Sequence, residues 1–137
     1  MTWHAYALPS GQALYFSGQA PGDVPHLYRV GIVEGMTSPI ARLDSLASSE
    51  GEQAPVVTAD EQVVFFTRYS STTSYDVFVA TRSLTSDPFG SARKVDELST
   101  ARYDHVTWVS ADGCRVYVNS DRNAPPGFED IFVADRP

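Results

Sequence analysis

The 137-residue sequence predicts an all-β fold built from about three copies of a four-stranded antiparallel sheet. Three observations predict it. One residue pattern recurs with a period near fifty, and each copy contains short β-branched or aromatic runs bounded by turn residues. No long stretch keeps the 3.6-residue apolar period of a helix. Four-stranded sheets that repeat at this spacing are typical of β-propeller blades.

The repeat is visible at two independent landmarks. The first recurs 50 and then 52 residues further on, at residues 9–18 (PSGQALYFSG), 59–68 (ADEQVVFFTR) and 111–120 (ADGCRVYVNS). The second recurs after 50 and then 54 residues, at residues 26–31 (HLYRVG), 76–81 (DVFVAT) and 130–135 (DIFVAD). Because order and spacing are kept together, the copies indicate a true internal repeat.

Four strands are expected in each complete copy, in the following order. The leading strands are expected at residues 4–8, 54–58 and 106–110, and the second strands at 13–16, 63–66 and 115–118. The third strands are expected at 26–30, 76–80 and 130–134, and the fourth at 41–46 and 92–98. The second and third strands are apolar at successive positions, so both faces of each sheet must be covered. An immunoglobulin-like sandwich, the alternative fold, would show cleaner alternation.

The chain is expected to form one propeller-type domain over residues 1–137. Its blades are predicted at about 1–52, about 53–104 and, without a fourth strand, about 105–137. Closed propellers have four to eight blades, and the end blades of an open arc expose apolar faces. We therefore expect either self-association, with two chains forming a six-bladed ring, or a longer parent polypeptide. The sequence does not distinguish between self-association and a longer parent polypeptide.

The third copy also carries a family resemblance. Residues 109–136 (VSADGCRVYVNSDRNAPPGFEDIFVADR) resemble the repeat of TolB-type, WD40-like bacterial propellers. The shared pattern is a Ser/Thr-x-Asp-Gly turn, an apolar strand, Ser-x-Arg, a Gly/Pro loop and Asp-Ile-aromatic-Val. Residues 58–82 match it with Glu61 in place of the glycine, and the match weakens over 1–52. The resemblance implies a bacterial source and often the cell envelope or periplasm, although no signal peptide is visible at the N-terminus.

Two arginines and two aspartates recur within this pattern. Arg68 and Asp76 lie eight positions apart, as do Arg122 and Asp130. A hairpin loop separates the members of each pair, so we expect structural ion pairs across its base. The first copy has Gly18 and His26 at these positions and lacks the pair.

Composition excludes several partners. The net charge is −7 and Lys94 is the only lysine, which argues against nucleic acid. No apolar run approaches the length of a membrane helix, so no membrane insertion is expected.

No catalytic residue, metal or cofactor is predicted. Hydrolase motifs and phosphate-binding loops are missing, and the histidines lack metal-ligand spacing. Propeller glycosidases need a carboxylate pair, which the leading strands do not carry. Cys114 is expected to be a small packing residue.

A binding surface remains. Trp3, His4, Tyr103, Asp104 and His105 lie in or just before the leading strands and are the candidate ligand contacts, because aromatic residues with a polar tip suit a binding face. Trp108 is expected in the blade core. The predicted function is a non-catalytic module that recognises a protein or peptide through a propeller end face. The alternative is the propeller portion of a carbohydrate- or peptide-hydrolysing enzyme whose catalytic residues lie elsewhere.

Overall fold

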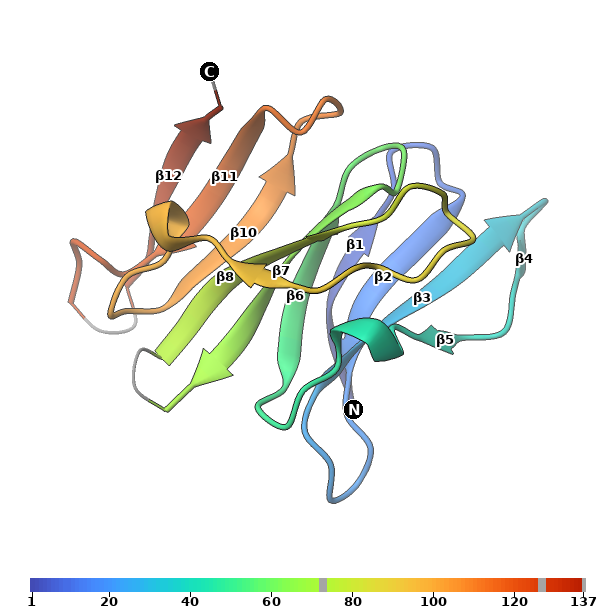
Figure 1. The fold of residues 1–137 in the computed structure, drawn as a ribbon, viewed down its shortest axis with the longest axis horizontal. Coiled ribbons are helices and arrows are strands. Elements are labelled where there is room, and N and C mark those ends of the chain that lie inside the picture. The colour runs from blue at the N-terminus through green and yellow to red at the C-terminus, as the bar shows by residue number, and fades with distance from the viewer. Residues whose placement is uncertain (72–73, 126–127, 137) are drawn as a thin grey trace.

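The structure is a computed structural model that describes residues 1–71, 74–125 and 128–136. Three antiparallel sheets follow one another along the molecule (Figure 1). The first contains β1 (Thr2–Ala7), β2 (Ala13–Gly18), β3 (His26–Val33), β4 (Met36–Thr37) and β5 (Ala41–Arg42). The second contains β6 (Glu52–Val57), β7 (Val63–Ser70), β8 (Ser74–Thr81) and β9 (Arg93–Lys94). The third contains β10 (Asp104–Val109), β11 (Arg115–Ser120) and β12 (Asp130–Asp135).

The predicted all-β class is therefore confirmed, with two local differences. The first sheet has an additional strand, β4, which pairs with the end of β3. The strands at the predicted fourth positions, β5 and β9, are only two residues long, and each is followed by a 3₁₀ turn, η1 (Asp44–Leu46) or η2 (Asp96–Leu98). The turn directs Leu46 and Leu98 into the interior, where both are buried. Burial of these leucines stabilises the turn in place of a longer strand. Parts of the loops predicted around residues 72–73 and 126–127 lie outside the described residues.

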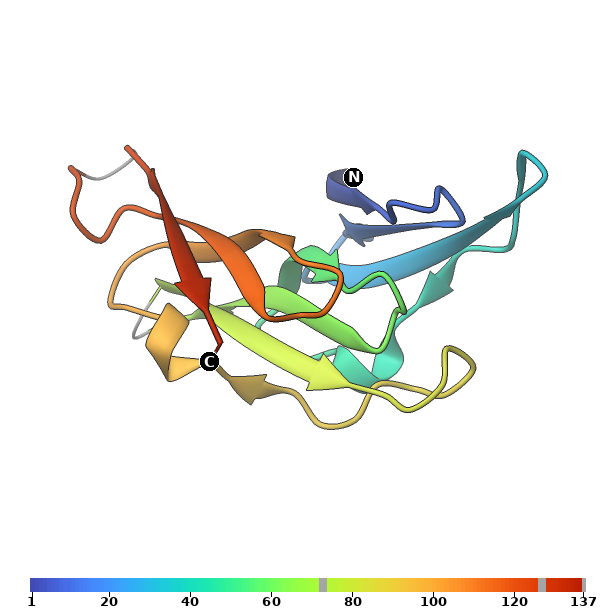
Figure 2. The ribbon, with the colours of Figure 1, turned by 90° about the horizontal axis from the view of Figure 1, so that it is seen from above.

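The leading strands of the three sheets lie next to one another. β6 contacts β1 on one side and β10 on the other, whereas β5 and β9 lie at the opposite edges of their sheets (Figure 2). This is the arrangement of consecutive propeller blades, in which the leading strands are innermost. No helix among the described residues is long and apolar enough to cross a membrane.

Side chains of the second strands alternate between two separate cores. Tyr15 of β2 packs with Val64 and Phe66 of β7 between the first and second sheets. Phe65 of β7 packs instead with Val118 of β11 between the second and third sheets. Because neighbouring residues of a strand point to opposite faces, the continuous apolar runs serve a core on each side.

Each leading strand contains a β-bulge near its middle. The pairing register shifts between Trp3 and Tyr6 in β1, between Gln53 and Val56 in β6, and again in β10. His4 and Ala54 occupy equivalent positions in the repeat and both have a φ of 50°. A bulge bends the strand and re-aims the side chains beside it.

The turn after the leading strand explains the unusual Glu61. Gly11, Glu61 and Gly113 are equivalent and have φ values of 72°, 58° and 70°. Glycine adopts this left-handed conformation freely, whereas glutamate does not. Arg29 donates to the Glu61 carboxylate from Nε at 2.6 Å, and the Tyr15 hydroxyl donates to the same oxygen. The carboxylate therefore links the first two sheets and offsets the backbone strain.

The two arginines of the predicted hairpin ion pairs bind other carboxylates. Arg68 Nε donates to Glu52 at 3.2 Å, and Asp76 is paired with Lys94 at 2.9 Å. Arg122 Nη2 donates to Asp104 at 2.7 Å, whereas Asp130 is exposed. Glu52 and Asp104 are fully buried, and a buried carboxylate needs a charged partner far more than an exposed one does.

These arginines also join consecutive sheets. Arg68 donates from Nη2 to the Leu46 carbonyl, and Arg122 donates from Nη2 to the Leu98 carbonyl. Each guanidinium thus ties its own sheet to the 3₁₀ turn that leads into it. His26, at the position of Asp76 in the first sheet, lies with Nδ1 3.0 Å from the Glu52 carboxylate.

Candidate functional site

A hollow of about 150 Å³ opens where the leading strands β1, β6 and β10 meet. Its walls come from all three sheets: His4, Ala5 and Tyr6 of β1, Ala54, Pro55 and Val56 of β6, and His105, Val106 and Thr107 of β10. We call it the inner-strand groove. The bulges lie beside it, so the irregular part of each leading strand forms the groove.

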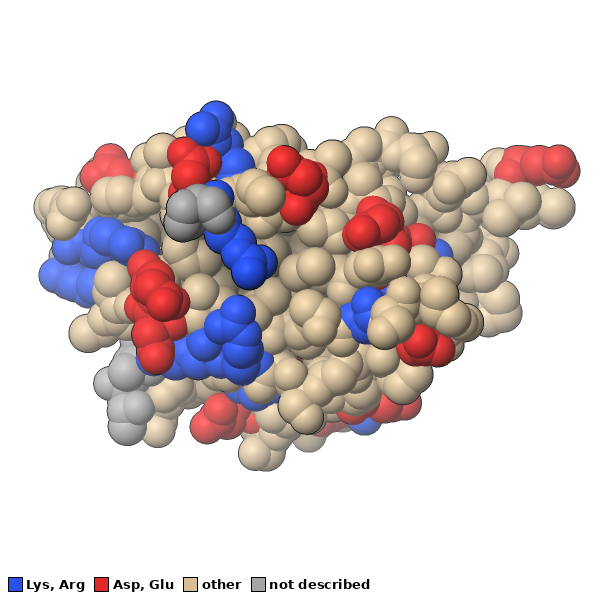
Figure 3. Space-filling view, turned by 45° about the horizontal axis from the view of Figure 1, so that its top comes forward, with Lys and Arg blue, Asp and Glu red and all other residues tan. Residues whose placement is uncertain are grey.

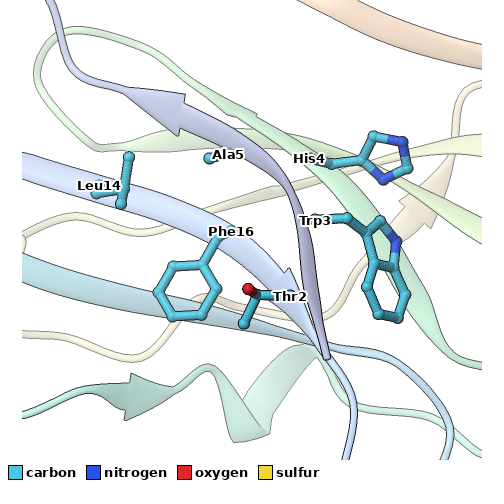
Figure 4. Close-up of a pocket in the computed structure, with 6 residues that line it drawn as sticks. All are labelled: Thr2, Trp3, His4, Ala5, Leu14 and Phe16. Carbon is cyan, nitrogen blue, oxygen red and sulfur yellow. The ribbon is translucent and has the colours of Figure 1, made fainter.

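Three equivalent positions of the repeat lie at or next to the lining of this groove: His105 lines it, and the other two directly precede residues that line it. They are Trp3, Gln53 and His105, spaced 50 and 52 residues apart. Trp3 Nε1 donates to Gln53 Oε1 at 3.1 Å, which connects the first two sheets. Figure 4 shows Trp3 and His4 side by side on β1, near a second hollow that β1 and β2 line.

Aromatic rings contact one another along this end of the molecule. His4 and His105 have ring centroids 6.4 Å apart, and those of His105 and Tyr103 are 5.0 Å apart. Tyr103 in turn lies 4.9 Å from Tyr75, which lies 5.3 Å from Tyr69. We call these five residues the aromatic row. Tilted and edge-on contacts of this kind are favourable geometries for aromatic pairs.

The two histidines of the row favour the neutral state. Burial lowers the pKa of His105, an effect that the nearby Glu129 carboxylate opposes. Partial burial of its ring also lowers the pKa of His4, although the residue as a whole is exposed. His105 Nδ1 is buried and has no hydrogen-bond partner among the described residues; its separation from Glu129 is 4.0 Å. Burial also raises the pKa of Tyr103 to about 12, so the phenol stays protonated.

We expect His4 and His105 to titrate below their ordinary pKa of 6.5 in a proton NMR titration of the folded chain. Because the folded pKa values are lowered, the stability these groups contribute is present in full above pH 6.5. It is lost as the pH falls through the lowered values. Titration of both rings at or above pH 6.5 would contradict the assigned burial.

The row can hydrogen-bond and stack, but it holds few metal ligands. No group of three or more His, Cys, Asp or Glu side chains among the described residues is arranged to hold a metal ion. A neutral imidazole offers one donor and one acceptor, and a protonated phenol offers both functions as well. These groups match the N–H and C=O groups of a polypeptide backbone.

The candidate contacts chosen from the sequence separate into two kinds. Trp3, His4, Tyr103 and His105 lie together at this end. Asp104 is instead fully buried, and Thr100 and Arg122 donate to its oxygens, so it holds the sheet rather than a ligand.

Sequence reasoning missed Gln53, Tyr69 and Tyr75. The repeat itself offers a signal for Gln53, since this residue stands at the position of Trp3 and His105. Tyr69 and Tyr75 flank the loop between β7 and β8, and only the approach of β10 to β8 brings them into the row.

Two other expectations were wrong. Trp108 is 41% exposed and contacts the Tyr117 ring at a tilted angle rather than filling a core. Cys114 is exposed in the turn before β11 instead of packing inside. Both belong to the third sheet, which has a neighbouring sheet on one side only.

Charges on the visible face of Figure 3 are mixed. Basic and acidic side chains alternate there instead of forming one continuous patch of a single sign. Among the described residues, Arg42 pairs with Asp44 and Arg115 pairs with Asp135 at exposed positions. Contacts to a ligand on this surface would therefore depend on local groups rather than on a strong overall field.

Comparison with known proteins identifies the fold. No family model and no curated protein matches the chain. The chain is similar to the crystal structure of TolB from Acinetobacter baumannii, with a TM-score of 0.64 and 14% sequence identity. The match covers 98% of this chain and 30% of the TolB chain, so this chain spans less than a third of that length. The predicted TolB-like propeller fold is confirmed, whereas membership of a repeat family stays a prediction.

Proposed function

We propose that this chain is a non-catalytic binding module that recognises a protein or peptide through the end face carrying the aromatic row. The row itself supports the proposal most strongly. Five side chains from several separate segments make consecutive ring contacts at one end, beside the inner-strand groove. Tyrosine and histidine combine apolar area with hydrogen-bonding tips, which is the chemistry favoured in protein interfaces.

An extended peptide segment fits the dimensions of the row. Successive ring centroids of the row lie 4.9 to 6.4 Å apart, and each such spacing corresponds to about two residues of an extended strand. Tyr69, at one end of the row, is 44% exposed, and His4 at the other end is also exposed. The neutral imidazoles and the phenols would pair with backbone groups, while the ring faces would cover side chains.

A peptide selection tests this function. The probe is a displayed library of random peptides, and binding of the selected sequences is then measured by fluorescence anisotropy. We expect Tyr69→Ala and Tyr103→Ala each to weaken binding by about tenfold or more, because tyrosines that a ligand covers often carry much of the affinity of an interface. Leu84→Ala is the matched control, since Leu84 is 61% exposed in the β8–β9 connection.

The control should bind like the unaltered chain. The proposal fails if the selection yields no specific binder. It also fails if the selected peptides bind the two tyrosine variants as tightly as they bind the control.

A further inference from the structure

Every sheet of this chain has two faces that are equivalent from copy to copy. One face, which we call the following face, packs on the next sheet along the chain; the other, the preceding face, packs on the sheet before it. In β7, for example, Phe65 belongs to the following face and Phe66 to the preceding face. The chain leaves two of these faces uncovered: the preceding face of the first sheet and the following face of the third.

The uncovered following face of the third sheet carries four exposed large apolar side chains, next to the exposed Arg115–Asp135 ion pair at its end. Trp108, Tyr117, Ile131 and Val133 are 41%, 37%, 73% and 57% exposed. Their equivalents in the second sheet are Val56, Phe65, Val77 and Val79. Of these, Val56 and Val77 belong to the core that the third sheet closes, and their exposures are 4% and 0%. The same positions are therefore buried or half-buried in the second sheet, which has a following sheet.

The uncovered preceding face of the first sheet is hollowed. Leu14 and Phe16 of β2, with Thr2, Trp3, His4 and Ala5 of β1, line a hollow of about 330 Å³ (Figure 4). The equivalents of Leu14 and Phe16 are Val64 and Phe66 in the second sheet, both 0% exposed against the first sheet. In the third sheet they are Val116 and Val118, which are buried against the second.

We propose that these two faces bind each other between two copies of this chain. The third sheet of one copy packs on the first sheet of the other, in the same way as the first sheet packs on the second within one chain. The contact is head-to-tail, so each copy offers both faces. Two such contacts close a two-fold ring of six sheets, within the range of blade numbers that closed propellers use.

The available area suits a stable dimer. A face three strands wide and six residues long covers roughly 290 Å² before surface relief is counted. A closed ring buries two such faces per copy, about 600 Å² of flat area, which relief raises toward the ~800 Å² per partner of a typical stable complex.

The ring also completes the site at the end of the inner-strand groove. Within one chain, Trp3 bonds Gln53 across the first junction of sheets. Across the new junction, His105 of one copy would hold the position that Trp3 holds at the first junction. Trp3 of the second copy would hold the position of Gln53, beside it. This inference stands apart from the proposed function, because the mass of the particle is measured without any ligand.

Light scattering on a size-exclusion column, from low to high micromolar concentration, tests the ring. We expect a particle of twice the chain mass of 15.0 kDa. Ile131→Asp places a charge on the uncovered following face, and Ala5→Arg fills the hollow on the preceding face. Both residues are exposed in the single chain, so circular dichroism should show an unchanged fold.

Each variant alone should raise the dimer dissociation constant by about tenfold or more. Leu84→Asp, a charge at an equally apolar exposed site away from both faces, should leave the dimer intact. A mixture of the Ile131→Asp and Ala5→Arg chains keeps one unaltered contact, so dimers should reappear. A contact between two identical faces could not be restored in this way.

Three results would overturn the proposal. One is a folded chain that stays monomeric at every concentration. Another is a dimer that tolerates either charged variant. The third is a particle that keeps growing beyond two copies, which would show that the head-to-tail contact does not close.

Discussion

The substitution Glu61→Gly is expected to lower the free energy of unfolding by about 2 kcal/mol, against what the repeat alone would predict. Both other copies have glycine at this left-handed turn, so the sequence suggests that glycine should be the better residue. The structure reverses this expectation, because the Glu61 carboxylate accepts hydrogen bonds from Arg29 and Tyr15 and lies 3.4 Å from Arg82. Glycine would remove the carboxylate that accepts from Arg29 and Tyr15 and pairs with the charge of Arg82.

The size of this effect follows from two opposing contributions. Removing one partner of a buried ion pair typically costs about 3–5 kcal/mol, because the remaining charge stays buried without compensation. The Arg82 side chain is only 4% exposed, whereas that of Arg29 is 29% exposed and partly hydrated. Glycine recovers about 1 to 2 kcal/mol of backbone strain. The stability lost with the carboxylate should therefore exceed the stability gained from the relieved backbone strain.

Urea denaturation followed by circular dichroism measures the difference. Gly11→Ala is the matched control, because Gly11 has a φ of +72° at the equivalent turn and a methyl group there would meet open space. It should cost about 1 kcal/mol from backbone strain alone. Stabilisation by Glu61→Gly would mean that the carboxylate network adds nothing.

The same variant changes the pH dependence of stability. Burial disfavours the Glu61 carboxylate, but hydrogen bonds from Arg29 and Tyr15 and the charge of Arg82 outweigh burial and hold its pKa below the ordinary 4.5. A lowered folded pKa contributes stability above pH 4.5 that disappears as the pH falls through the folded value. The gap in stability between the unaltered chain and Glu61→Gly should therefore narrow as the pH falls below about 4.5 toward the lowered folded pKa.

The substitution Asp104→Asn is expected to cost about 3 kcal/mol of stability. Asp104 Oδ2 accepts from the Thr100 amide at 2.6 Å and from the Thr100 hydroxyl at 2.7 Å, while Oδ1 accepts from Arg122. All three neighbours are donors. An asparagine amide brings one N–H₂ group of its own, which must face either Thr100 or Arg122 and meets a donor in both orientations.

Asp130→Asn is the matched control for this experiment. Asp130 is the exposed aspartate that the sequence pattern paired with Arg122. Its substitution should change the free energy of unfolding by less than about 0.5 kcal/mol in the same urea titration. Equal losses of stability from the two variants would indicate that Arg122 pairs with Asp130, as the sequence predicted. That result would contradict the ion pair between Arg122 and Asp104.

The strands were predictable because their signals are local. Strand and turn residues recur in fixed order, and a strand was found at each expected place. The buried partners were not predictable in the same way. Arg68 and Asp76 lie opposite each other in the β7–β8 register, as the spacing suggested. Arg68 nevertheless donates to Glu52 of β6, the strand on the other side of β7.

The candidate site was predictable only in part. Trp3, His4, Tyr103 and His105 were chosen for their residue type and their place before the leading strands. Their contacts depend on β6 bringing β1 and β10 together, which places His4 near His105 from opposite ends of the sequence. Asp104 was misassigned because an aspartate at a strand start looks the same whether solvent or Arg122 satisfies it.

The sequence by itself determined the repeat, the strands within each copy and the two-faced apolar pattern of every sheet, because these follow from residue type and spacing along the chain. Only the tertiary structure decided which equivalent positions are buried. Val56 and Trp108 hold the same place in their copies, yet Val56 is covered by the next sheet and Trp108 is 41% exposed. Burial and charge pairing depend on the neighbouring sheet, and that neighbour differs between the middle and the ends of the arc.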